Sequence, residues 1–354
     1  MSEPENKILL TQYAHGAGCG CKIAPQVLEE ILQNQIAPQN FKNLLVGNGS
    51  NDDAAVFDLG DGKALISTTD FFTPIVDDAY DFGRVAAANA ISDVYAMGGK
   101  PLLALAILGW PVNKLPAALA RQVIEGARAI CAEAGIPLAG GHSIDTTEPI
   151  FGLSVNGMVD HAHLKKNNTA REGDFVFLTK PLGVGILSTA QKRNLLRDED
   201  KENWLKQLVQ LNKIGEQLGK ISGVTAMTDV TGFGLLGHLI EMAEGSHLTV
   251  ELNYNLIPKI TSLEHYMARG IVPDATYRNW NAYQRKVSFE DEVNVAEAFS
   301  LLPDPQTNGG ILFSVTEKSV QDVVKKLIDN NLSEFTTPIG QMLSSADKTI
   351  KVKN

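Results

Sequence analysis

Residues 81–99 read DFGRVAAANAISDVYAMGG. This stretch indicates the fold class, because it predicts a helix and lies between two predicted strands. It predicts a helix over Asp81–Met97, and Gly98-Gly99 is typical of a helix C-terminus, where glycine accepts a left-handed backbone. The apolar run 102–108 that follows predicts a strand. Before the helix, strands are predicted at Val56 and over 64–69, around a turn with the sequence LGDGK.

The same alternation of strands and helices continues along the chain. Further strands are predicted at 151–159, 175–179, 248–252, 311–315 and 349–352. Further helices are predicted at 25–32, 116–134, 198–221 and 319–330. Cys131 lies on the apolar face of the second of these, so we expect it in the core. The pattern indicates an α+β protein built of α/β layers.

The length of 354 residues predicts two domains, each large enough for its own core. We expect a glycine-rich N-terminal arm and lead-in at 1–48, an N-terminal domain at 49–160 and a C-terminal domain at 169–354. The polar stretch 161–168 is the expected connection between the two domains.

Composition narrows the class of protein. A hydrophobic content of 44% and a charged content of 20% are those of an ordinary soluble globular protein, so we expect no membrane partner. The N-terminus is polar and acidic, and the most apolar run is about a dozen residues, short of the roughly 20 that a membrane span needs. The net charge of −10 argues against a nucleic-acid partner. Three cysteines make no disulfide framework, which predicts a reducing, cytoplasmic location.

Acidic residues follow or precede predicted strands and lie on the central helix. Each is ordinary by itself, because aspartate is common at turns and caps. Together they predict an acidic cage for Mg²⁺ and a phosphorylated substrate, since Mg²⁺ prefers hard oxygen ligands. Two glycine segments, at 139–143 and 305–310, offer backbone N–H groups to anions. The acidic positions and their neighbours on the helix are Asp52, Asp53, Asp70, Asn89, Ser92, Asp93 and Asp229.

The segment HGAGCGCK at 15–22 holds two of the three cysteines. Its glycines allow the backbone to approach a ligand closely. Lys22 is adjacent to Cys21, and a neighbouring ammonium favours the thiolate form of cysteine. The segment therefore predicts a mobile arm that carries a soft nucleophile and a cation.

Other interpretations of this arm are weaker. A P-loop is excluded because Cys21 takes the place of its second glycine and Ile23 that of its Ser or Thr. A structural zinc site needs about four ligands, and only His15, Cys19 and Cys21 are close together. A disordered N-terminal tail is the main alternative, with metal and disulfide roles behind it.

The motifs taken together resemble the selenophosphate synthetase (selenide, water dikinase) family of the aminoimidazole ribonucleotide synthetase-like superfamily. They cover nearly the whole chain in order, and the thiol–lysine arm separates this family from its superfamily relatives. The motifs are HGAGCGCK at 15–22, NDDAAV at 51–56, STTDFF at 67–72, NAISDVYAMGGKP at 89–101, AGGHS at 139–143, MTDVTGFGLLGH at 227–238 and DPQTNGG at 304–310.

The resemblance implies a two-domain fold in which the N-terminal domain binds ATP and metal. That domain would contribute strands to a barrel at the interface of a homodimer, and the C-terminal domain would be of the α/β type. The implied reaction converts selenide, ATP and water into selenophosphate, AMP and phosphate. The nucleotide site would lie near the subunit interface.

The resemblance also implies roles for single residues. Cys19 and Lys22 would be catalytic, with Lys22 in contact with phosphate. Mg²⁺ would be held by Asp53, Asp93 and Asp229. The ATP-binding positions would be Lys22, Ser50, Asn51, Asp52, Asp70 and Asp93, with Gly141, His142 and Ser143 reaching the nucleotide from the partner subunit.

Three other interpretations of function remain at this point, one of them a metal-chaperone role for the pair Cys19 and Cys21. Another kinase of the superfamily, such as one acting on thiamine phosphate, is disfavoured because an oxygen acceptor has no need of a soft thiol. A non-enzymatic ATP-binding sensor could use Cys19 and Cys21 as a redox or metal switch. Such a sensor would bind ATP without releasing AMP when selenide is supplied.

Overall fold

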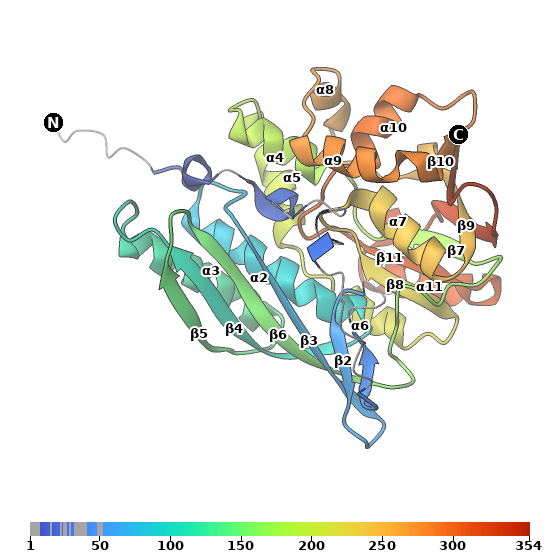
Figure 1. The fold of residues 1–354 in the computed structure, drawn as a ribbon, viewed down its shortest axis with the longest axis horizontal. Coiled ribbons are helices and arrows are strands. Elements are labelled where there is room, and N and C mark those ends of the chain that lie inside the picture. The colour runs from blue at the N-terminus through green and yellow to red at the C-terminus, as the bar shows by residue number, and fades with distance from the viewer. Residues whose placement is uncertain are drawn as a thin grey trace.

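The structure is a computed structural model that describes residues 8–14, 16–21, 23, 27, 30–31, 41–47 and 52–354. Two sheets lie on either side of a central helix, α2 (Ala79–Ala96), as Figure 1 shows. Within the described ranges, no helix combines the length and hydropathy of a transmembrane span.

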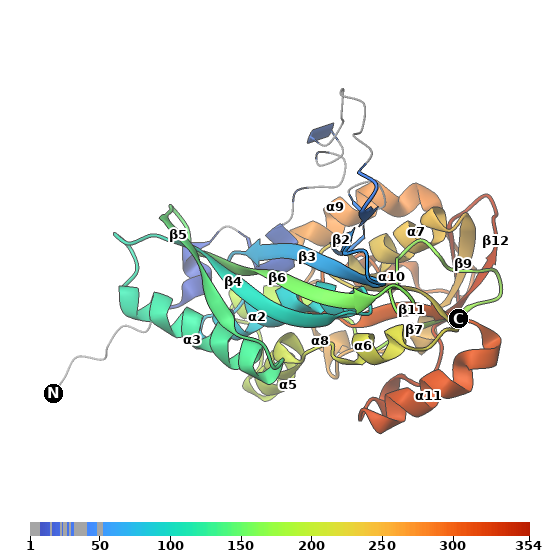
Figure 2. The same cartoon turned by 90° about the horizontal axis from the view of Figure 1, so that it is seen from below.

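The N-terminal sheet has six strands in the order β1-β2-β3-β6-β4-β5. Its neighbours pair antiparallel except β4 and β5, which are parallel and joined through helix α3 (Ala117–Glu133). Helices α2 and α3 contact each other and pack on the sheet (Figure 2). The strands are β1 (Leu44–Val46), β2 (Ala55–Asp58), β3 (Lys63–Phe72), β4 (Lys100–Trp110), β5 (Leu138–Asp145) and β6 (Ile150–Asp160).

One face of the N-terminal sheet is buried and the other is exposed, as the alternating burial of side chains along β3 shows. Ala64 and Ile66 are fully buried, as expected where successive side chains point to opposite faces. Phe71, Leu105 and Ile144 on β3, β4 and β5 are instead exposed. The described strands form an open sheet, and no closed barrel exists within the single chain.

Helix α2 begins and ends where its sequence predicts. Asp78 caps its N-terminus by accepting a hydrogen bond from the N–H of Asp81 at 2.9 Å. Gly98 follows the last turn with φ of +74°. A Cβ on Gly83 would lie 1.9 Å from the Val123 carbonyl oxygen, so α2 and α3 touch backbone to backbone at this glycine. The helix is buried almost all round because both domains pack against it.

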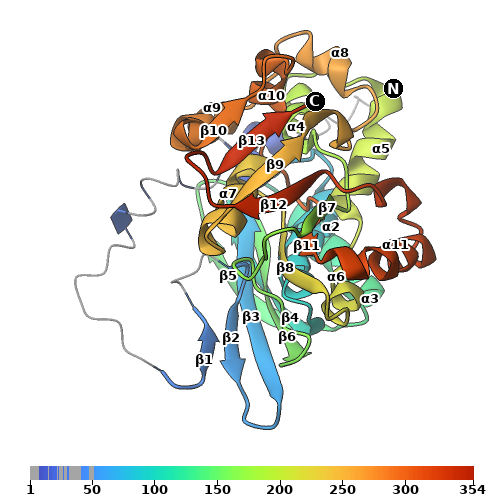
Figure 3. The same cartoon turned by 90° about the vertical axis from the view of Figure 1, so that its right-hand side faces the viewer.

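The C-terminal sheet has seven strands in the order β10-β13-β9-β12-β7-β11-β8, and Figure 3 shows β13, β9 and β12 side by side. Pairs are antiparallel except β10–β13 and β13–β9. The strands are β7 (Phe175–Leu178), β8 (Val224–Asp229), β9 (Leu248–Asn253), β10 (Val287–Phe289), β11 (Ile311–Val315), β12 (Gly340–Ser344) and β13 (Ile350–Lys353).

Eight α-helices are described in this domain. They are α4 (Val184–Lys192), α5 (Asp198–Val209), α6 (Ile214–Gly219), α7 (Gly234–Gly245), α8 (Leu263–Met267), α9 (Asp274–Tyr283), α10 (Val295–Leu301) and α11 (Val320–Asp329). Short 3₁₀ turns occur at η1 (Leu10–Tyr13), η2 (Gly18–Cys21), η3 (Tyr254–Leu256), η4 (Gln284–Lys286), η5 (Glu317–Ser319) and η6 (Ser333–Phe335).

The charged helical region predicted over 198–221 contains two helices, α5 and α6, because Gln210 leaves the helix with ψ of 120°. The glycine segment 139–143 lies within strand β5, a strand that the sequence did not predict, and pairs with β4. That it offers N–H groups to anions stays a prediction. The helix predicted at 25–32 falls largely outside the described residues.

Cys131 lies in the core, as predicted, and is 0% exposed. Burial away from water raises the pKa of its thiol to about 11, because the apolar surroundings disfavour the thiolate. The thiolate is the reactive form of cysteine. Cys131 is therefore both inaccessible and chemically inert in the folded protein.

We expect Cys131 to resist iodoacetamide at pH 8 in the folded protein and to react readily in urea. Peptide mass spectrometry after timed labelling measures both rates. Labelling of folded protein at a rate near that in urea would contradict the burial of this thiol.

Candidate functional site

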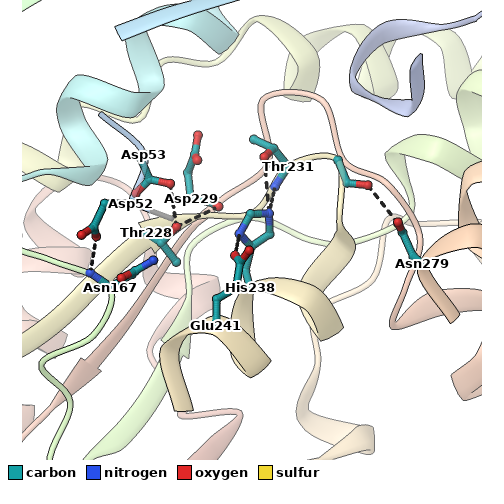
Figure 4. A network of polar contacts seen from close by, with 10 residues as sticks. Asp52, Asp53, Asn167, Thr228, Asp229, Thr231, His238, Glu241 and Asn279 are labelled. Atoms are coloured by element: carbon teal, nitrogen blue, oxygen red, sulfur yellow. Dashed lines mark hydrogen bonds and ion pairs between the residues drawn. The ribbon is translucent and has the colours of Figure 1, made fainter. Parts of the chain in front are cut away.

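Four aspartates meet where the N-terminal domain faces the C-terminal domain. Asp52 and Asp53 precede β2, Asp93 lies on α2 and Asp229 ends β8. Burial raises the pKa of Asp53 well above its usual value, and the negative charges of Asp229, Asp93 and Asp52 add to this rise. The structure thus brings the three predicted metal ligands together, and Figure 4 shows Asp52, Asp53 and Asp229. We call Asp52, Asp53, Asp93 and Asp229 the aspartate cluster.

Neutral hydroxyl groups hold three of these carboxylates in place. Thr228 donates to Oδ1 of Asp53 at 2.8 Å. Thr68 donates to Oδ2 of Asp93 at 2.5 Å, from β3. Ser92 donates to Oδ2 of Asp229, which joins α2 of one domain to β8 of the other. These bonds orient the carboxylates without neutralising their charge.

The cluster suits a cation that arrives with its own further ligands. Asp53 is half-buried as a residue, yet its Oδ2 atom is buried and has no hydrogen-bond partner within the described residues. Across those same residues, no three His, Cys, Asp or Glu side chains form a group that could hold a metal ion by themselves. Mg²⁺ commonly binds through one or two carboxylates together with substrate phosphates and water. The donor set therefore fits Mg²⁺ bound to a nucleotide better than a cage made by the protein alone.

The polar face of α2, whose shared side the spacing predicts, contacts the C-terminal domain. Asn89 donates to Asp70 at the end of β3 and accepts from the N–H of Asn308 at 2.7 Å. The hydroxyl of Ser92 accepts from Nδ2 of Asn212 at 2.8 Å. One helix face thus fixes the positions of Asp70 and Asp229.

Lys180, at the end of β7, is a buried residue that sequence reasoning missed. Its Nζ donates to the carbonyl oxygens of Gln210 at 2.7 Å and Asn308 at 2.9 Å. Burial lowers the pKa of Lys180 to about 7, against the opposing effect of the Asp229 charge. Asn308 itself has φ of +50°, and its side chain donates to the carbonyls of Leu208 and Gln210. The sequence carried no sign of this burial, because a lysine after a strand is usually exposed.

A histidine holds the turn that follows Asp229. The N–H of Thr231 donates to Nε2 of His238 at 3.2 Å, and Nδ1 of His238 lies 3.1 Å from Oε2 of Glu241. Asn279 donates to the carbonyl of Gly232 at 2.9 Å (Figure 4). This turn fixes the end of β8, and with it the backbone of Asp229.

The remaining predicted residues lie elsewhere. Gly141, His142 and Ser143 are on β5, the outermost strand, which pairs with β4 and not with an element of the cluster. The Oδ1 atom of Asp52 accepts from the N–H of Asn167 at 2.7 Å, in the connection between the domains. His15, Lys22, Ser50 and Asn51 lie outside the described residues.

The backbone of Cys19 is described, and it lies within η2. Its neighbour Gly18 has φ of +51° and donates from its N–H to the Thr73 carbonyl at 3.1 Å. A Cβ on Gly18 would lie 2.5 Å from Oγ1 of Thr307 and 2.7 Å from Cδ1 of Ile75. Glycine is therefore the residue that fits at position 18. These contacts place the arm between the end of β3 and the loop 304–310.

Comparison with known proteins places the chain in a family. Residues 51–159 match the family AIR synthase related protein, N-terminal domain, and residues 171–353 match AIR synthase related protein, C-terminal domain. The chain is 53% identical over 352 residues to a selenide, water dikinase of Pseudomonas putida, covering 99% of this chain and 100% of that protein. A selenide, water dikinase of Photobacterium profundum is 57% identical over 336 residues, with coverage of 95% and 96%.

Solved structures share the fold at low sequence identity. A thiamine-monophosphate kinase from Stenotrophomonas maltophilia has a TM-score of 0.64 at 18% identity, covering 94% of this chain and 96% of that one. The hydrogenase maturation protein HypE in complex with ATP has a TM-score of 0.65 at 19% identity, with coverage of 97% and 94%. The predicted two-domain fold of the aminoimidazole ribonucleotide synthetase type is confirmed.

We expect Asp53→Asn to raise the melting temperature of metal-free protein by about 2–4 °C, because it removes one of several like charges held close together. The same change should weaken the further stabilisation that MgATP gives to the wild type. Calorimetry in EDTA and then in MgATP measures both effects, with Asp329→Asn at the exposed end of α11 as the control. A variant that melts below the wild type in EDTA would contradict the repulsion.

We expect Lys180→Met to flatten the pH dependence of the free energy of unfolding. The pKa of Lys180 is about 7 in the folded chain and 10.5 ordinarily, so the unfolded chain binds more protons between these values. Stability of the wild type should then rise relative to the variant by roughly 2 kcal/mol between pH 7 and pH 9. Urea unfolding at several pH values tests this, with exposed Lys206→Met as the matched control. Parallel profiles for wild type and Lys180→Met would rule it out.

Proposed function

Because this chain belongs to the selenide, water dikinase family, we propose that its aspartate cluster binds MgATP while selenide is converted to selenophosphate. The protein is a phosphotransferase, and its reaction consumes selenide, ATP and water and releases AMP and phosphate. The observation that carries the assignment of the site is the buried group of like charges around Asp53. Such a group is costly to fold unless a bound cation offsets it.

In the proposed complex, Asp53, Asp93 and Asp229 hold Mg²⁺ against the phosphates of ATP. Bound Mg²⁺ would neutralise negative charge on the phosphoryl group that is transferred. The hydroxyls of Thr68, Ser92 and Thr228 keep the carboxylates turned toward this position.

We assign ATP binding to Asp52 and Asp70, together with Lys22, Ser50, Asn51 and Asp93. Support comes from Asn89, which joins Asp70 to the loop 304–310 by hydrogen bonds on both sides of its amide. In this assignment Asp70 lies next to the phosphates, and it is held by the helix α2 that also carries Asp93.

We also propose that Cys19 and Lys22 serve the selenium-bearing acceptor. The loop 304–310 supports this, because Thr307 packs on Gly18 beside Cys19 while Asn308 bonds to Asn89 of α2. The thiol arm and helix α2, which carries Asp93 of the aspartate cluster, thus both contact this loop. A thiolate must stay reduced to act, which favours work in the cytoplasm.

A homodimer is the proposed assembly. Among the described strands β5 is outermost and pairs on one edge alone, and Leu105 and Ile144 on β4 and β5 are exposed at 39% and 58%. Exposed strand edges with apolar side chains pair readily with a second sheet. Such pairing would bring Gly141, His142 and Ser143 to the nucleotide site of the partner. We place the boundary between the domains in the connection 161–168.

Phosphorus NMR of the protein with MgATP and selenide, under anaerobic reducing conditions, tests the function. We expect selenophosphate, AMP and orthophosphate, and none of the selenophosphate when selenide is omitted. Transfer of phosphate to thiamine phosphate with no selenophosphate would identify another kinase of the superfamily. ATP binding without AMP release would instead identify a sensor.

We expect Cys19→Ser to abolish selenide-dependent turnover and Cys21→Ser to reduce it less. A hydroxyl gives no useful anion near neutral pH, whereas a thiol with a pKa of ~8.5 does. Residue 19 lies directly after Gly18, which packs against the loop 304–310. The two variants are compared in one assay of AMP release, and the opposite order of severity would refute the assignment.

A further inference from the structure

Two cations of the C-terminal domain hold the backbone of the glycine-rich arm. Lys192, in the last turn of α4, donates from Nζ to the carbonyl of Ala14 at 3.0 Å and to that of Gly16 at 3.1 Å. Arg278, on α9, donates from Nη2 to the carbonyl of Gly20 at 2.8 Å. The three carbonyls lie on both sides of residues 17–19, so the two side chains clamp the segment that contains Cys19.

The clamped segment also rests on backbone contacts. The N–H of Gly18 donates to Thr73, and the N–H of Gly20 donates to the carbonyl of Ala17 at 3.2 Å, which closes a tight turn. Gly18 and Gly20 carry no side chain that could anchor them. Ordering such a segment costs conformational entropy, and hydrogen bonds from charged donors are the strong kind that offset this cost.

The clamp and the arm together line a pocket of about 760 Å³. Gly16, Ala17 and Gly20 form one wall, and Lys192 and Arg278 contribute to the others. Thr307 of the loop 304–310 lines the same pocket. The shape of this space therefore depends on where the arm is seated.

We propose that Lys192 and Arg278 are positioning residues for phosphoryl transfer, which fix the backbone around Cys19 against the loop 304–310. This inference rests on the proposed function, because it gives the arm a catalytic role. The two residues act through the arm, and their bonds go to its carbonyl groups. None of these three bonds goes to the aspartate cluster or to its hydroxyl donors.

The test compares Lys192→Met and Arg278→Met with Lys192→Arg and Arg278→Lys, which keep the charge. Exposed Lys201→Met on α5 is the surface control. Two quantities are measured: kcat and the KM for ATP from phosphorus NMR, and the rate of Cys19 alkylation by iodoacetamide from peptide mass spectrometry. Buried Cys131 reports any general unfolding in the same digest.

We expect Arg278→Met to lower kcat about tenfold and to change Cys19 alkylation about tenfold, the size of one lost charge-assisted hydrogen bond. Lys192→Met loses two such bonds and should have at least the same effect. The KM for ATP and the labelling of Cys131 should stay within about twofold, a change worth little free energy. The charge-keeping variants should recover most of both quantities. Rescue separates positioning from a general loss of fold.

Three results would overturn the proposal: changed alkylation with normal kcat, reduced kcat with unchanged alkylation, or no change in either. Equal loss in the Met and charge-keeping variants would also overturn it. Failure of the proposed function gives a different result, since wild-type protein would then make no selenophosphate at all. Alkylation of Cys19 would still decide in that case whether the clamp seats the arm.

Discussion

The hydrogen bond from Ser92 to Asp229 is the contact on which the site depends, because it joins the two domains inside the aspartate cluster. Ser92 belongs to a helix that packs on the first sheet, and Asp229 ends a strand of the second. Asn212 donates to the same hydroxyl and to the carbonyl of Gly309, which extends the joint to the loop that contacts the arm. Domain docking and site assembly are therefore one event.

The aspartate cluster opposes the stability of the chain that contains it. Burial and the neighbouring carboxylates raise the pKa of Asp53, and the hydroxyls that donate to Asp53, Asp93 and Asp229 are neutral and leave the charges in place. Burial of Lys180 is a second unfavourable contribution to stability, close enough to Asp229 to feel its charge, and it lowers the pKa of Lys180 to about 7. Sites that bind metal and phosphate commonly lower the stability of the folded chain, and packing of the surrounding core compensates for this loss. Here that core includes α2, which is buried by both domains.

Periodicity and spacing predicted much of this site, and long-range contacts account for the rest. The helix over 81–97 and its face of Asn89, Ser92 and Asp93 followed from local rules, since a helix fixes which residues share a face. The strand at 139–143 was missed because a glycine pair gives no local sign of pairing with β4. Lys180 was missed because its burial arises from Gln210 and Asn308, which lie 30 and 128 residues away.

The residues that hold the arm bind its main-chain atoms, so the side chain of residue 19 can change without loss of these contacts. Lys192 and Arg278 bond to carbonyl groups, while Gly18 contributes its N–H and its lack of a side chain. None of these contacts depends on which atom residue 19 carries beyond its backbone. Replacement of sulfur by selenium at that position would keep these backbone contacts unchanged. If Cys19 has the role proposed above, the chain could therefore carry a softer nucleophile there without any change in the residues that hold the arm.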